Sequence, residues 1–283
     1  MIISHFPSYL PSNNNLVYPQ VIDAISKTDT LVEGQMDADA ALIWSVLWFG
    51  KMSGNKKVWE QYRSQNKPVI VIEVGGLLRN QTWKLGINGI NKLANFGNMD
   101  NLDDSRVEKL GLTLQDWKTN GEYVLICGQH AHSEQWKNMP DMETYYKDTV
   151  LQVRKNNDRP IVIRSHPRYR EGLHFSCDMD WFKEHNVIWN IPKQIQQTYD
   201  SFDLDNLFNH TYMTISYSSN AGITSILNGV PAVVGEQSLA HPMTSYTNTI
   251  MIPNREKWLQ ELSYIEWFPD EIDQQWLRIR EFL

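Results

Sequence analysis

The segment YMTISYSSNAGITSILNGVPAVVGE, residues 212–236, predicts a strand, a polar turn, a helix and a second strand in succession. Every second residue from Met213 to Tyr217 is apolar, which is typical of a β-strand. The apolar residues of 223–227 have helical spacing, and the short run 232–234 suits a buried parallel strand. Two such strands joined through a helix form a βαβ unit, so this segment indicates an α/β fold.

The polar turn between the first strand and the helix is a candidate anion-binding site. Ser218 and Ser219 precede the helix, and Asn220 and Gly222 belong to the same turn. The free N–H groups at a helix N-terminus, just past the carboxyl end of a strand, attract phosphate groups. An ordinary βαβ unit, in which the serines only cap the helix, explains the same residues equally well.

Composition and charge limit the classes of function. The chain has 283 residues, of which 41% are hydrophobic and 21% charged, so we expect a folded protein with a hydrophobic core. A net charge of −7 argues against non-specific nucleic-acid binding through bulk charge. No apolar run approaches about 20 residues, so no transmembrane helix is predicted. Cys127 and Cys177 are the only cysteines and the first residues do not resemble a secretion signal, so we expect a reduced, cytoplasmic protein.

Strands and helices alternate along two halves of similar size. In the first half the predicted strands are residues 2–6, 41–48 and 69–74, and the predicted helices are residues 16–26 and 55–65. In the second half the predicted strands are residues 123–127, 160–164, 187–189, 213–217, 232–234 and 249–252. The predicted helices are residues 142–156, 179–185, 202–209, 258–268 and 270–282, together with the helix that contains residues 223–227 and stops at Gly229. We therefore expect two doubly wound, Rossmann-like α/β domains that face each other across a cleft, with ligands at the facing carboxyl ends of the strands.

The polar segment from Asp100 to Asp116 is expected to link the two domains. This gives an N-terminal domain of residues 1–115 and a C-terminal domain of residues 116–268. Residues 77–111 show no clear period, so they are interpreted as a long ordered loop with short helices. The loop follows the carboxyl end of a strand, which is where open α/β sheets place their ligands.

Two turns in the second half carry further candidate ligands for an anion. Arg164, His166 and Arg168 follow one predicted strand, and their side chains can donate hydrogen bonds to phosphate oxygens. Gly128 and Gln129 follow the preceding strand, where a glycine allows a ligand to approach the backbone closely. An exposed basic turn is the alternative for the first of these segments.

Other nucleotide and metal motifs are missing from the sequence. It contains no P-loop pattern and no G-x-G-x-x-G fingerprint after the first strand. His130 and His132 form an H-x-H pair, but no third ligand lies near them in the sequence, so no metal site is predicted.

Glu73 is the candidate general base. It is a polar residue near the end of an otherwise apolar strand, where its carboxylate can accept a proton from an acceptor hydroxyl. A capping or salt-bridge role explains Glu73 as well, and His5 is an alternative base. Asp37 and Asp39 are weaker rivals, because they precede their strand and therefore lie at the wrong end of the sheet.

The motifs of the second half resemble those of a known enzyme family. SYSSNAGITSILNGVPAVV, residues 216–234, resembles the donor-site segment of GT-B glycosyltransferases, especially of capsule-type sugar transferases. The strand followed by His166, Pro167 and Arg168 is similar to their phosphate-binding turn. VIVIEVGGLLRNQTWKLGINGIN, residues 69–91, resembles the acceptor-side segment of related proteins, many of them encoded by bacteriophages.

The resemblance implies a nucleotide-sugar donor, expected to be UDP-linked, that binds mainly to the C-terminal domain with no required metal and no tightly bound cofactor. It also implies that the final helix, residues 269–283, packs back on the first domain. The predicted donor-binding residues are Gly128, Gln129, Arg164, His166, Arg168, Ser218, Ser219, Asn220 and Gly222.

The resemblance to phage proteins implies a sugar acceptor in DNA. The predicted reaction transfers a sugar to a hydroxylated pyrimidine, such as 5-hydroxymethylcytosine, in double-stranded phage DNA in the host cytoplasm. Aromatic side chains would stack the flipped base. The predicted acceptor-binding residues are Trp44, Trp48, Arg79, Trp83 and Asn88. Two alternatives stay open: a glycosyltransferase that acts on a surface or capsular polysaccharide, and a nucleotide-sugar-binding module without catalysis.

Overall fold

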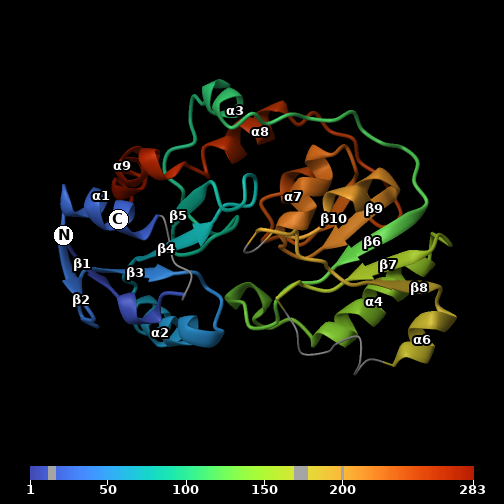
Figure 1. Ribbon diagram of the computed structural model, residues 1–283, viewed down its shortest axis with the longest axis horizontal. Helices are drawn as coiled ribbons and strands as arrows, with labels where there is room; N and C mark the ends of the chain where they lie inside the picture. Colours follow the sequence, from blue (N-terminus) through green and yellow to red (C-terminus); the bar gives the residue numbers. More distant parts are fainter. Residues whose placement is uncertain (12–16, 169–177, 199–200) are drawn as a thin grey trace. The chain divides into compact units, whose positions relative to one another are not determined.

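The computed structural model describes residues 1–11, 17–168, 178–198 and 201–283. These residues form two compact units, each built on one five-stranded sheet (Figure 1). Unit 1 comprises Met1–Gly111 and Lys257–Leu283, and unit 2 comprises Leu112–Glu256. Leu16 and Cys177, which entered the sequence predictions, lie outside the described residues.

The sheet of unit 1 has the strand order β2-β1-β3-β4-β5. Its first four strands are parallel, and β5 runs antiparallel to β4. Helix α1 (Tyr18–Ser26) packs on one face of this sheet and α2 (Asn55–Ser64) on the other (Figure 1). The strands are β1 (Ile2–His5), β2 (Thr30–Glu33), β3 (Ala40–Trp44), β4 (Val69–Val74) and β5 (Trp83–Ile87).

The sequence does not predict β2 and β5. β2 is an edge strand whose residues all stay at least partly exposed, so it lacks an apolar alternation. β5 lies within residues 77–111, which glycines and asparagines give the appearance of a loop, and the same segment contains α3 (Ser105–Lys109). β3 ends at Trp44 rather than at the predicted Trp48, because Ser45 adopts the left-handed conformation with a φ of 58°.

The C-terminal segment completes the core of unit 1. It contains α8 (Glu256–Ser263) and α9 (Ile272–Arg280). The residues from Lys257 onward belong to unit 1, whereas the sequence predicts this only for residues 269–283. Trp276 and Ile279 of α9 are buried in the same hydrophobic cluster as α1. The segment therefore supplies part of the hydrophobic surface on which the unit folds.

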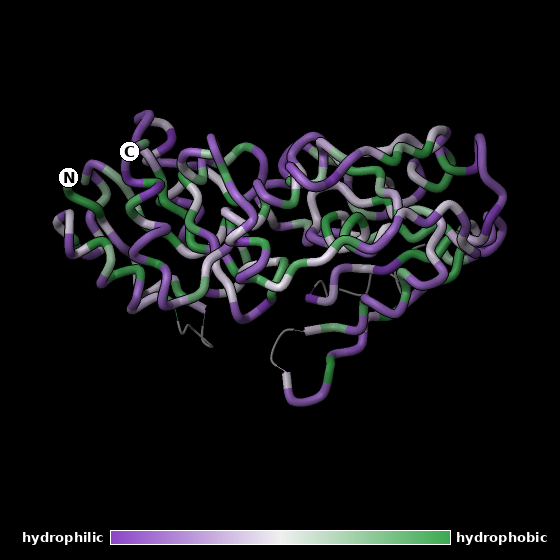
Figure 2. The backbone as a smooth tube through the Cα atoms, turned by 90° about the horizontal axis from the view of Figure 1, so that it is seen from above, coloured by the Kyte–Doolittle hydropathy of each residue, from purple (hydrophilic) through white to green (hydrophobic). Residues whose placement is uncertain are grey.

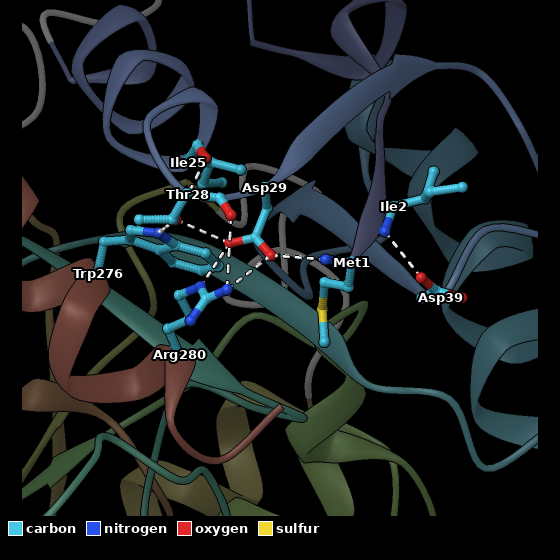
Figure 3. A network of polar contacts seen from close by, with 8 residues as sticks. All are labelled: Met1, Ile2, Ile25, Thr28, Asp29, Asp39, Trp276 and Arg280. Atoms are coloured by element: carbon cyan, nitrogen blue, oxygen red, sulfur yellow. Dashed lines mark hydrogen bonds and ion pairs between the residues drawn. The ribbon is translucent and has the colours of Figure 1, made fainter.

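Asp29 connects the end of α9 to the start of the chain (Figure 3). Its buried carboxylate accepts hydrogen bonds from Arg280 Nε at 2.6 Å, from the amino group of Met1 at 2.8 Å and from the Thr28 hydroxyl at 2.7 Å. Burial by itself raises the pKa of a carboxyl group, but these bonds outweigh burial and hold the pKa of Asp29 well below its ordinary value. Trp276 adds a hydrogen bond to the Thr28 hydroxyl from the same helix.

The sheet of unit 2 is entirely parallel and has the strand order β10-β9-β6-β7-β8. Helices α4 (Met142–Arg154) and α6 (Met179–Glu184) pack on one face, and α7 (Asn220–Leu227) packs on the other (Figure 1). Both units thus have helices on both faces of their sheets, which confirms the predicted doubly wound α/β class. The strands are β6 (Tyr123–Cys127), β7 (Ile161–Arg164), β8 (Val187–Asn190), β9 (Thr211–Ser216) and β10 (Ala232–Val234).

Two elements predicted for unit 2 differ in the structure. The predicted helix 202–209 is a short 3-10 helix at Asp205–Asn209. Residues 249–252 are all described and form no strand, only an isolated bridge between Tyr246 and Thr249. Further 3-10 turns are Pro7–Tyr9, Gly50–Gly54, Glu134–Trp136, His241–Met243 and Pro269–Glu271.

Hydrophobic stretches alternate with hydrophilic ones throughout both units (Figure 2). Across the described residues, the structure contains no helix with the length and apolarity that a membrane span requires.

We predict that D29N lowers the free energy of unfolding by about 2 kcal/mol at pH 7, since a buried carboxylate with several donors loses its charge. The folded-state pKa of Asp29 is depressed, so its contribution to stability is complete above the ordinary carboxyl pKa of about 4 and is lost as the pH falls below that value. Urea denaturation of both proteins at pH 7, 4.5 and 2.5 measures the difference. D23N, which removes an exposed partner of Lys27, is the control and should leave stability nearly unchanged. An equal effect of D29N at all three pH values would contradict the assignment.

Candidate functional site

The carboxyl ends of three neighbouring strands of unit 2 lie side by side. In the sheet register, Cys127 at the end of β6 pairs with Ser216 at the end of β9 and with Arg164 at the end of β7. The turns that follow these three strands therefore begin at the same level of the sheet. They carry the predicted donor-binding residues, so the structure brings that predicted set together at one sheet edge.

Gln129 joins two of these turns. Its Oε1 accepts hydrogen bonds from the backbone N–H of Ser218 at 3.1 Å and from the Ser218 hydroxyl at 2.7 Å. A backbone N–H can only donate, so the orientation of the Gln129 amide is fixed. Its Nε2 is buried, and it has no hydrogen-bond partner among the described residues. Gln135, which the sequence analysis did not single out, also accepts from the Ser218 hydroxyl, at 3.2 Å.

Helix α7 begins directly after this contact. Ser219 is its N-cap, with the side chain accepting from the N–H of Ala221 at 3.3 Å, and Asn220 is its first residue. The hydroxyl of Ser216, at the end of β9, is buried beside this first turn and also has no hydrogen-bond partner among the described residues. Two buried donors, Gln129 Nε2 and Ser216 Oγ, therefore accompany the N-terminus of α7. A buried donor normally has an acceptor, so this part of the edge is suited to oxygen atoms of a ligand.

His130 and His166 lie close together, with ring centroids 5.4 Å apart. Nδ1 of His130 accepts from the backbone N–H of His132 at 3.3 Å, and Nδ1 of His166 accepts from that of Arg168 at 3.1 Å. Because these N–H groups only donate, both Nδ1 atoms are unprotonated and each neutral ring carries its hydrogen on Nε2. Both histidines are thus neutral hydrogen-bond donors through Nε2.

His130 is held in the neutral form by its surroundings. It is buried, and burial lowers its pKa to about 4, with the neighbouring His132 acting in the same direction. In the described part of the chain, no group of three or more His, Cys, Asp or Glu side chains is arranged to hold a metal ion.

Arg164, a predicted phosphate ligand, is engaged by partners inside the protein. Its side chain is buried, its Nη2 donates to Asp203 at 2.9 Å, and its Nη1 donates to Asn190. A buried guanidinium requires such partners, and they account for the position of the Arg164 side chain without a ligand. Arg168 is half-buried, and its guanidinium lies 5.8 Å from the ring centroid of Phe202.

The two predicted glycines are explained by packing. A Cβ atom on Gly128 would come within 1.9 Å of the Tyr146 hydroxyl, and one on Gly222 would come within 2.7 Å of Val234. Both positions therefore require glycine for contacts within unit 2, whereas the sequence analysis assigned Gly128 to the approach of a ligand.

In unit 1, the predicted base Glu73 lies near the carboxyl end of β4. Its Oε2 accepts a hydrogen bond of 2.6 Å from the hydroxyl of Ser45, a residue that the sequence analysis missed. His5 ends β1 and shares a hydrogen bond of 2.8 Å between its Nδ1 and the Tyr18 hydroxyl. Burial lowers the pKa of His5, against an opposing effect of Glu33. Asp39 accepts from the N–H of Ile2 at the other end of the sheet, as its position before β3 predicts (Figure 3).

The predicted acceptor-binding residues are dispersed over unit 1. Trp44 and Trp83 are buried in the hydrophobic core, so neither ring offers a face for base stacking. Trp48 is half-buried, and its ring centroid lies 6.1 Å from that of Trp59. Arg79 is exposed. Asn88 exchanges backbone and side-chain hydrogen bonds with Val69, at the amino end of β4 and therefore away from Glu73. The structure does not bring these five residues together as a base-binding surface.

Solved structures with a similar fold include two sugar transferases of Thermosulfurimonas dismutans KpsC. The β-Kdo 2,4-transferase is 13% identical, with a TM-score of 0.53, and the match covers 94% of this chain and 90% of that chain. The β-Kdo 2,7-transferase is 10% identical, with a TM-score of 0.50, and the match covers 99% of this chain and all of that chain. No protein-family model matches the sequence, and no curated protein matches it significantly. At this identity the similarity concerns the fold, which is GT-B-like, as the sequence analysis predicts.

We predict that His130 keeps a neutral ring from pH 8 down to about pH 5.5 in the folded protein, because its pKa is lowered to about 4. NMR titration of the ring signals, assigned with an H130N variant, measures this. In urea the same histidine should titrate near the ordinary value of about 6.5. The unfolded chain binds the proton first, so this residue makes stability fall as the pH drops from about 6.5 towards 4. A titration midpoint above pH 6 in the folded protein would refute the prediction.

Proposed function

We propose that this chain is a glycosyltransferase that uses a nucleotide-sugar donor. The observation that carries the proposal is the edge of the unit 2 sheet, where the N-terminus of α7 lies beside the buried donors Gln129 Nε2 and Ser216 Oγ. Hydrogen-bond donors that converge at a helix N-terminus suit the phosphate oxygens of a nucleotide. The similarity of fold to two proteins named as Kdo transferases supports transfer of a sugar as the reaction class.

The donors at this edge suit a leaving phosphate. His130 and His166 lie at this edge, each held through its Nδ1 by a backbone N–H, and the helix N-terminus supplies a partial positive charge. When the bond between the sugar and the phosphate breaks, its electron pair stays on the phosphate oxygen. Fixed donors around that oxygen stabilise the added charge without having to reorganise. A UDP-linked donor remains a prediction of the sequence.

We assign the acceptor to the hydroxyl of a glycan, as in the surface- or capsular-polysaccharide alternative. Two observations weigh against the modified-DNA acceptor. Trp44 and Trp83, which were to stack the flipped base, are core residues, and the net charge of −7 disfavours a phosphate backbone. A transfer assay must separate a glycan acceptor from two alternatives: hydroxymethylated DNA as the acceptor, and a binding module without catalysis.

We predict that the purified protein binds and turns over a nucleotide sugar from a panel that contains UDP-glucose, UDP-N-acetylglucosamine and CMP-Kdo. The assay adds glycan acceptors in one arm and 5-hydroxymethylcytosine DNA in another, and mass spectrometry detects the added sugar. Sugar on the glycan alone supports the assignment, and sugar on the modified base alone replaces it with DNA modification. Donor binding without hydrolysis or transfer would indicate the non-catalytic module.

In the same assay, we predict that H166A lowers turnover by about 100- to 1,000-fold, as removal of one preorganised donor does in other enzymes. The melting temperature should change by only a few degrees, because His166 is a half-buried turn residue. H210A is the matched control, since His210 directly precedes β9 and therefore lies at the opposite end of the sheet. Wild-type turnover in H166A would remove His166 from the donor site.

A further inference from the structure

One face of the unit 1 sheet carries three polar side chains in a row, just past the end of β3, on β4 and on β5. Val71 of β4 faces α2, and side chains alternate along a strand, so Glu73 points the same way. Ser45 directly follows the last residue of β3, and its hydroxyl lies on this face because it donates to Glu73. On β5, Lys84 pairs directly with Glu73 in the register. Its neighbours Trp83 and Leu85 belong to the cluster on the other face, so Lys84 lies on the α2 face as well.

Ser45 is held in an unusual position. It is buried, its backbone is in the left-handed region with a φ of 58°, and its N–H extends the ladder by donating to the carbonyl of Ile72 at 2.8 Å. Its Oγ accepts from the N–H of Leu47 at 3.2 Å. The hydroxyl hydrogen is therefore the group that reaches Glu73 Oε2 at 2.6 Å. This backbone region favours glycine, so a serine at this position is explained by the hydrogen bond of its hydroxyl.

The Glu73 carboxylate is held in a fixed orientation, but its oxygens can accept further hydrogen bonds. Ser45 donates to its Oε2, and the N–H of Val74 donates to its Oε1 at 2.9 Å. Each carboxylate oxygen has two lone pairs, so one on each oxygen remains for another donor. The residue is half-buried and therefore still reachable from solvent, whereas Ser45 and Lys84 are 4% and 2% exposed. A fixed carboxylate with open lone pairs, supported by buried neighbours, is the arrangement that a general base requires.

Lys84 is the basic residue that lies opposite Glu73 in the strand pair. A lysine that is only 2% exposed needs a negative neighbour, and the residue directly opposite it on the adjacent strand is Glu73. The bonds that fix the Glu73 carboxylate come from Ser45 and Val74, and among the described residues Lys84 forms no direct ion pair with it. Lys84 therefore enters the proposal below only through the longer-range effect of its charge.

We propose that Ser45, Glu73 and Lys84 form the acid–base group of the transfer reaction, and this proposal rests on the proposed function. Glu73 takes the proton of the acceptor hydroxyl, and the freed oxygen electron pair forms the bond to the anomeric carbon of the sugar. The bond from that carbon to the donor phosphate breaks, and its electron pair leaves on the phosphate oxygen. Glu73 ends the step as a carboxylic acid and returns the proton to solvent. Ser45 is a positioning residue for Glu73, and Lys84 offsets its charge.

Three variants test this group: S45G, E73A and K84M. S45G removes the hydroxyl and suits the left-handed backbone, so its melting temperature should equal or exceed that of wild type. We expect donor affinity within twofold of wild type and a kcat reduced about 10- to 100-fold, the usual range for loss of a supporting hydrogen bond. E73A should lose about 100- to 10,000-fold in kcat, and sodium formate should restore part of it, because formate can take the proton in place of the missing carboxylate.

K84M should lower kcat with donor affinity unchanged. E60A and K57M, on exposed positions of α2, are the matched controls and should behave like wild type. The measurements use hydrolysis or transfer of the nucleotide sugar that the wild-type protein turns over, with donor affinity determined separately by calorimetry.

The outcomes separate this proposal from the proposed function. If wild type neither binds nor turns over any nucleotide sugar of the panel, both proposals are overturned. If wild type is active and E73A retains its kcat within a few-fold, or loses it without rescue by formate, Glu73 is not the base. A kcat of S45G within twofold of wild type would exclude Ser45 as a positioning residue, and the same result for K84M would exclude the role of its charge.

Discussion

The parallel hydrogen-bond register of the unit 2 sheet is the constraint on which its candidate site depends. Parallel strands bring all their carboxyl ends to one edge, and here Ser216, Cys127 and Arg164 end at the same level. Turns that are almost 90 residues apart in sequence, such as those of Gln129 and Ser218, therefore meet and form direct hydrogen bonds. The site is thus a product of strand pairing, and a register shift in β6 or β9 would separate its parts even if every turn kept its local conformation.

At this edge, the charged side chain that is expected to bind phosphate is engaged by the protein itself. Arg164 is the residue that charge alone marks as a phosphate ligand, but it is buried and engaged by Asp203 and Asn190, where it holds three segments of the chain together. The same edge also carries His166, whose Nδ1 accepts from the backbone N–H of Arg168, and the N-terminus of α7. Neutral donors cost less to bury than a cation without a partner.

Local patterns predict the elements that carry their own signal. The strand, turn and helix of residues 212–236 are found as expected, since alternation, capping and a glycine stop are properties of adjacent residues. The partners of side chains are a different matter. Asp203 lies 39 residues from Arg164, and nothing near Arg164 in the sequence indicates that partner. The burial of Trp44 and Trp83 likewise depends on α1 and α9, which come from opposite ends of the chain.

Sequence analysis does not predict that Ser45, Glu73 and Lys84 lie side by side, because it does not predict the short strand β5. Residues 77–111 have the glycines and asparagines of a loop, and within a loop Lys84 has no defined neighbour. Once Trp83–Ile87 pairs with β4, the alternation of the strand turns Trp83 and Leu85 into the core and sets Lys84 against Glu73. The register that buries the two apolar residues is therefore the one that buries the lysine. A lysine is retained there at a cost in solvation, which an aliphatic side chain would avoid, so its charge rather than its packing is the property that distinguishes this position.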